Sequence, residues 1–93
     1  MSPLSDEQIK QRMAALDGWA LDGNEIRRTF TFDAFMAGIR FVQKVAELAE
    51  EADHHPDILI NYDRVTLSLS THSEGGLTDR DMDLARRIDR LLE

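Results

Sequence analysis

The 93-residue sequence predicts an α+β fold, a four-stranded antiparallel sheet with helices packed on one face. Two observations lead to this prediction. Strands with alternating apolar residues come in two pairs, and a short turn joins the members of each pair. Stretches with helical spacing of apolar residues precede, separate and follow the pairs, which gives the order α-β-β-α-β-β-α. Tight hairpins require antiparallel pairing, so the helices are expected to gather on one face.

The first helix is expected to begin at Asp6 and to end at Gly18. Ser5 and Gln8 have the spacing of a capping box, in which each residue satisfies a backbone N–H near the other. Glycine is common just beyond the end of a helix, which places the end at Gly18.

A hairpin is expected next, with strands at 19–21 and 25–32. The Asp-Gly-Asn sequence at 22–24 is a turn signal between them. The alternation along the second strand predicts three side chains on one face: Ile26, Phe30 and Phe32.

The central helix is expected to run from its cap, Asp33, to about Asp53. It must end there because the residue before Pro56 is disfavoured in the α region. Two adjacent apolar stripes follow helical spacing. The stripe expected to be buried consists of Phe35, Ile39, Val42, Ala46 and Ala49. The second stripe, expected to contact another helix or a second subunit, consists of Phe41, Val45, Leu48 and Ala52.

The second hairpin and the last helix complete the fold. The two strands are indicated by alternating apolar residues, namely Ile58, Ile60 and Tyr62 in the first and Val65, Leu67 and Leu69 in the second. Residues 61–64 connect the strands, and core packing is expected for Tyr62. Thr78 is expected to cap the last helix. Its inward side chains are expected to be Ala85, Ile88 and Leu92.

Composition limits the class of protein. The chain is long enough for one core and too short for two ordinary domains, so residues 1–93 are expected to form a single domain. A domain this small buries a modest share of its surface, so a homodimer or homotetramer is expected. A net charge of -7 argues against binding to nucleic acid or to a membrane. The lack of cysteine and of a long apolar run fits a cytoplasmic protein.

All three histidines of the chain lie at the ends of predicted elements near the second hairpin. His54 and His55 follow the central helix, and His72 follows the last strand. Antiparallel pairing would bring these segments side by side, so three imidazoles are expected to converge. Imidazole changes its protonation state near neutral pH, and the cluster therefore predicts proton-transfer chemistry, with Glu50 and Asp81 within reach.

Plainer interpretations of these residues remain open. The two adjacent histidines could be polar loop residues, favoured by the dipole at a helix end. No metal site is expected, because neighbours in an extended chain point to opposite faces and His54 and His55 could not easily bind one ion. Asp81 has capping-box spacing from Thr78, and Glu50 could be a solvated helix residue.

A set of spaced residues extends over the second half of the chain and consists of Glu50, His54, His55, Pro56, Tyr62, His72 and Asp81. Two further segments are the run from Thr71 to Leu77 and the Gly18-Trp19 pair. With these spacings the chain resembles the pterin-4a-carbinolamine dehydratase family over essentially its whole length. The family's fold is similar to the order of elements predicted above.

The resemblance implies an enzyme, a 4a-hydroxytetrahydrobiopterin dehydratase. Such an enzyme removes water from the 4a-carbinolamine left by an aromatic amino acid hydroxylase and gives quinonoid dihydropterin, with no metal or organic cofactor. The catalytic residues implied by matching position are His54, His55 and His72. The residues implied near the bound pterin are Pro56, Thr71, Ser73 and Glu74, with Glu50 and Asp81 as further candidates. Whether His54 or His72 serves the departing hydroxyl stays open.

Two questions stay open beside this resemblance, namely the natural pterin and a second possible function. Family members often carry aromatic residues after the His-His-Pro, whereas residues 57–61 here are Asp-Ile-Leu-Ile-Asn, so the physiological pterin is open. The alternative function is a non-catalytic binding or assembly module that acts through helix contacts, because some family members look like partners of transcription factors. Three histidines and an acid at one place favour the enzyme.

Overall fold

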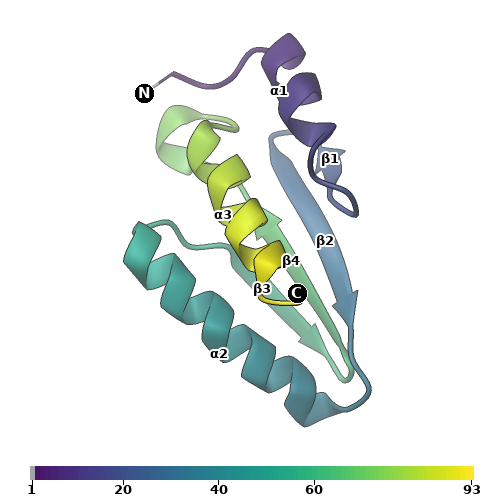
Figure 1. Cartoon of the computed structure of the whole chain (residues 1–93). Helices are drawn as coiled ribbons and strands as arrows, with labels where there is room; N and C mark the ends of the chain where they lie inside the picture. Colours follow the sequence, from purple (N-terminus) through teal and green to yellow (C-terminus); the bar gives the residue numbers. More distant parts are fainter. Residues whose placement is uncertain (1) are drawn as a thin grey trace.

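The structure, a computed structural model, describes residues 2–93 and shows three α-helices and one four-stranded sheet. The elements follow the predicted order, and the helices lie on one face of the sheet (Figure 1). All strand pairs are antiparallel, in the order β1-β2-β4-β3. The α+β prediction is confirmed. The elements are α1 (Asp6–Met13), β1 (Ala20–Asp22), β2 (Glu25–Thr31), α2 (Phe35–Ala52), β3 (Asp57–Asn61), β4 (Arg64–Leu69), the 3₁₀ helix η1 (His72–Glu74) and α3 (Asp79–Arg90).

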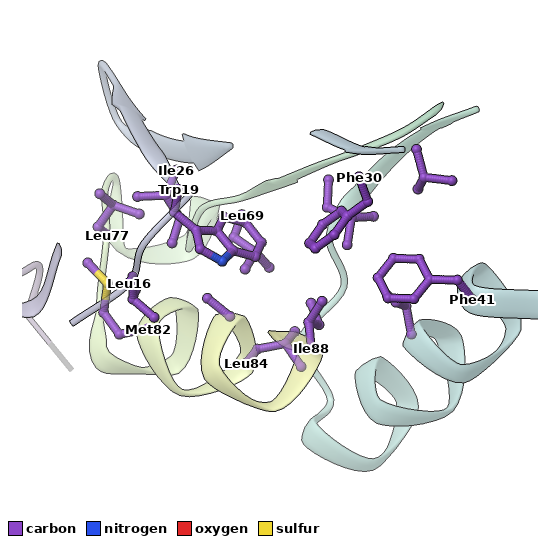
Figure 2. Close-up of a cluster of buried hydrophobic side chains, with 14 residues drawn as sticks. Leu16, Trp19, Ile26, Phe30, Phe41, Leu69, Leu77, Met82, Leu84 and Ile88 are labelled. Carbon is purple, nitrogen blue, oxygen red and sulfur yellow. The ribbon is translucent and has the colours of Figure 1, made fainter. Parts of the chain in front are cut away.

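The core lies between the sheet and the two longer helices. β2 and β4 are the central strands, and their inward side chains are almost completely buried because they have a strand on both sides and helices above them. Figure 2 shows Trp19, Phe30 and Phe41 in this cluster. The rings of Trp19 and Phe30 meet edge to face at 6.1 Å, and those of Phe30 and Phe41 lie 4.8 Å apart.

Both predicted capping boxes are present. Gln8 and Ser5 exchange side-chain to backbone bonds at the start of α1, and Asp81 and Thr78 do the same at the start of α3. The predicted end of α1 is wrong, because the helix stops at Met13. The chain then turns so that Leu16 and Trp19 enter the core.

The apolar stripe of α2 that was predicted to be buried is the more exposed of the two stripes. Phe41 and Val45 are buried, whereas Phe35 is 42% exposed and Ala46 is exposed; Ala49 is buried as predicted. Gly38 favours this orientation of α2 on the sheet, because a Cβ at that position would lie 3.3 Å from Val65 Cγ2 of β4. Without that Cβ, this side of α2 packs closely on the sheet. No helix within residues 2–93 is both long and apolar enough to cross a membrane.

Three predictions at the ends of elements are wrong. Asp33 does not cap α2, because Ala34 occupies the cap position and no side chain bonds there. Tyr62 lies in the β3–β4 turn with a φ of 52° and is 70% exposed, since the strand ends one residue earlier. Leu92 is 48% exposed because α3 ends at Arg90.

Candidate active site

The end of α2 directs two neighbouring histidines in different directions. Asp53 adopts a left-handed conformation with a φ of 49°, and its N–H donates to the carbonyls of Ala49 and Glu50. The chain then leaves the helix, and β3 begins immediately after Pro56. As a result His54 contacts α3, whereas His55 contacts α2.

His54 belongs to a buried polar network. It is 8% exposed, and its Nε2 lies 2.5 Å from Oδ1 of Asp81, which is fully buried. The other carboxylate oxygen of Asp81 accepts hydrogen bonds from Thr71 Oγ1 at 2.8 Å and from the Thr78 N–H at 2.9 Å. The hydroxyls of Thr71 and Thr78 lie 2.8 Å apart. The network therefore joins the end of α2, the segment after β4 and the start of α3.

His55 has a different environment. Its Nε2 lies 2.5 Å from Glu50 Oε2, and the two side chains are 56% and 79% exposed. A pair this exposed is solvated and contributes little to stability. It is free to contact a ligand that approaches from solvent.

His72 begins the short η1 helix that follows β4. It is exposed and lines a hollow of about 320 Å³, together with Ser70 and residues of the β1–β2 turn, Asp22, Asn24 and Glu25. Gly75, with a φ of +73°, donates its N–H to the His72 carbonyl and closes the turn. Glycine suits this position, because without a Cβ it adopts a left-handed φ at little cost.

The structure brings the chain segments that carry the three histidines to one end of the sheet. Asp81 bonds both His54 and Thr71, and Thr71 precedes His72. The imidazoles of His54 and His72 nevertheless line different hollows, since His54 lines one of about 260 Å³ with Glu51, Arg80 and other residues of α2 and α3. That all three imidazoles surround one ligand therefore stays a prediction.

The remaining candidate residues differ in exposure. Ser73 is exposed and Pro56 and Glu74 are partly buried, whereas Thr71 and Asp81 are in the interior. Sequence reasoning did not include Thr78 in the site. The capping-box spacing was the available signal, because a cap next to Asp81 holds that carboxylate in place. Within residues 2–93 no cluster of three or more acidic or histidine side chains is arranged to hold a metal ion.

Fold and site together define a small α+β protein with a histidine held by a buried carboxylate, an arrangement suited to proton transfer. The model of the family described as pterin 4 alpha carbinolamine dehydratase matches residues 2–91. The chain belongs to this family.

Relatives with the provisional name pterin-4-alpha-carbinolamine dehydratase support this assignment. A protein of Mycobacteroides abscessus is 54% identical over 96% of this chain and 95% of its own length. One from Sulfolobus acidocaldarius is 43% identical over 95% of this chain and 97% of its own.

Two solved structures are similar to this fold. A transcriptional coactivator/pterin dehydratase from Brucella melitensis has a TM-score of 0.93 and 36% identity, and the match covers 99% of this chain and 100% of that one. A pterin dehydratase-like RuBisCO assembly factor of the alpha-carboxysome has a TM-score of 0.66 and 23% identity, over 78% and 84% of the two chains. The second likeness concerns the fold alone.

Proposed function

We propose that the protein dehydrates 4a-hydroxytetrahydropterins to quinonoid dihydropterins by histidine acid–base catalysis without a resident metal or organic cofactor. In this proposal it acts in the cytoplasm and recycles the pterin of an aromatic amino acid hydroxylase. Family membership supports the class of reaction. The observation that carries the mechanism is the His54 imidazole, which the buried Asp81 holds beside the segment leading to His72.

The chemistry requires two proton transfers and no redox step. The C4a–O bond of the substrate breaks, and the departing hydroxyl takes up a proton to leave as water. A ring N–H loses a proton, and its electron pair forms the new C=N bond. Two imidazoles in different environments can serve these two roles at neutral pH, and His54 and His72 differ sharply in burial. His55, with Glu50, is then available to orient the ring.

Substitution of the histidines tests the proposal. His54→Gln keeps an N–H donor for Asp81 and cannot exchange a proton near neutral pH, and His72→Ala removes an exposed imidazole. Each is expected to lower the dehydration rate by roughly a hundredfold or more. Asp33→Asn, which changes an exposed residue that lines neither the His54 hollow nor the His72 hollow, is the control and should keep the wild-type rate. Wild-type turnover in both histidine variants would support the alternative, a non-catalytic binding or assembly module.

A second proposal concerns assembly, and the edge strand β3 supports it. Within residues 2–93, β3 pairs only with β4, and its central side chains Ile58, Leu59 and Ile60 are 38%, 63% and 38% exposed. An exposed apolar edge of this kind favours pairing with another strand. Ile58 and Ile60 lie on the helix-covered face of the sheet, because their partners Leu67 and Val65 belong to the core.

We propose that a second copy of the chain occupies this edge. The strand sequence Asp-Ile-Leu-Ile-Asn is self-complementary under antiparallel two-fold pairing centred on Leu59. Ile58 then lies opposite Ile60 of the second copy, and Asp57 lies opposite Asn61, so that no two like charges face each other.

Lysine on an edge strand opposes edge-to-edge pairing, so Leu59→Lys should lower the mass measured by sedimentation equilibrium to that of a monomer. Leu21→Lys is the matched control, because Leu21 is 51% exposed on β1, the opposite edge of the sheet. A Leu59→Lys protein with the wild-type mass, or a monomeric wild type at micromolar concentration, would contradict assembly through β3.

A further inference from the structure

The carboxylate of Asp81 has more hydrogen bonds than helix capping requires. The Thr78 N–H, the bond that defines the capping box, uses Oδ2, which also accepts from Thr71. Oδ1 is left to His54 Nε2 alone. Asp81 is fully buried, with 0% of its surface exposed, so its carboxylate is not open to a ligand that approaches from solvent. A buried carboxylate is costly unless donors surround it, and here each oxygen has at least one.

These contacts fix where the proton of His54 lies. A carboxylate only accepts hydrogen bonds, so Nε2 of His54 carries the hydrogen, and Nδ1 of the neutral ring is then an acceptor. Within residues 2–93, no hydrogen bond reaches Nδ1, and no buried side-chain nitrogen or oxygen is without a partner. Nδ1 therefore reaches solvent, and His54 lines the hollow between the ends of α2 and α3.

We infer that Asp81 is a positioning residue, which holds His54 as the Nε2–H tautomer and directs Nδ1 to the hollow as the atom that exchanges a proton with the ligand. This role rests on the proposed function. It replaces the pterin contact that the sequence predicted for Asp81. The two hydroxyls of Thr71 and Thr78 act through Asp81, because they hold its carboxylate in one orientation.

Asp81→Asn separates positioning from capping. Asparagine also caps helices, so its amide oxygen can still accept from Thr78 N–H and Thr71 Oγ1. Its NH₂ then faces His54 Nε2 and donates to it, which moves the ring hydrogen to Nδ1. The fold should survive while the exposed nitrogen loses its ability to accept a proton. An equivalent change in a serine protease triad leaves the geometry intact and gives the wrong tautomer, with a loss of about 10⁴ in kcat.

The test combines NMR and kinetics. Long-range ¹H–¹⁵N correlation of the histidine rings above neutral pH should show the Nε2–H tautomer for His54 in the wild type and the Nδ1–H tautomer in Asp81→Asn. The kcat of dehydration should fall by roughly 10² to 10⁴ with KM within about threefold of the wild type. Asp79→Asn is the matched control, because it makes the same change in the first turn of α3 at a residue that pairs with Arg12.

Two results would overturn the inference: an Nδ1–H tautomer in the wild type, which is measured without any variant, or wild-type kcat in a folded Asp81→Asn protein. The tautomer readout also separates this inference from the proposed function. If the wild type does not accelerate dehydration, the proposed function fails, while the reversal of the tautomer in Asp81→Asn still supports control of His54 by Asp81.

Discussion

Replacing Thr71 with valine removes one hydroxyl from the buried network around Asp81 and preserves the shape of the side chain. Thr71 is 3% exposed, and its Oγ1 donates to Asp81 Oδ2 at 2.8 Å. Since that hydroxyl has one hydrogen, the Thr78 hydroxyl must donate to Thr71. The valine therefore removes a donor from a buried carboxylate and leaves the Thr78 hydroxyl without its acceptor.

The expected cost follows from these two losses. A hydrogen bond to a charged group contributes about 1.5 to 3 kcal/mol, and an unpaired buried hydroxyl costs about 1 kcal/mol more, so we expect a loss of roughly 2.5 to 4 kcal/mol. Urea unfolding followed by the fluorescence of Trp19, the only tryptophan, measures it. At a slope of about 1 kcal/mol per M, the midpoint should fall by about 2 M or more.

The control is the same substitution on the open face of the sheet. Thr29 Oγ1 lies 2.9 Å from Thr66 Oγ1, and Thr29 is exposed, so Thr29→Val should change stability by no more than about 0.5 kcal/mol. If Thr71→Val costs no more than Thr29→Val, the network does not hold Asp81 as described.

Two further predictions concern a turn and the chemistry of the site. Gly18→Ala should destabilise the protein by more than Gly23→Ala. Both glycines have a positive φ, but only at Gly18 would the new Cβ meet the Arg28 guanidinium, at 2.8 Å. Urea unfolding of both variants measures the two losses of stability, and equal losses would contradict this prediction. A chelator should leave the dehydration rate unchanged, because within residues 2–93 no three acidic or histidine side chains are grouped to hold a metal ion. A loss of activity restored by a divalent cation would refute this.

Local patterns in the sequence were sufficient to predict the order of elements and the helix starts at Asp6 and Asp79. Capping boxes and alternation act within a few residues, so they can be read from the sequence directly. Local patterns could not predict which apolar stripe of α2 faces the core. Both of its stripes are apolar, and the contact between Gly38 and Val65 that selects one of them joins residues far apart in the sequence.

The residue types of the site could be predicted from the sequence, whereas the directions of their side chains could not. The hairpin pairing was sufficient to place the histidine segments at one end of the sheet. The direction of His54 could not be predicted, because it depends on the left-handed turn at Asp53 and on the hydrogen bond to Asp81. Spacing suggested that Asp81 caps a helix, and only the three-dimensional structure shows that the same carboxylate also holds an imidazole.

The proposed function requires that this chain accelerate the loss of water from a 4a-hydroxytetrahydropterin through His54. Stopped-flow absorbance of the freshly generated carbinolamine, mixed with wild-type protein, with His54→Gln or with buffer, measures this step directly. We predict a rate constant that rises in proportion to wild-type concentration and a rise at least about a hundredfold smaller for folded His54→Gln. Identical decay with and without wild-type protein would contradict the proposed dehydratase activity.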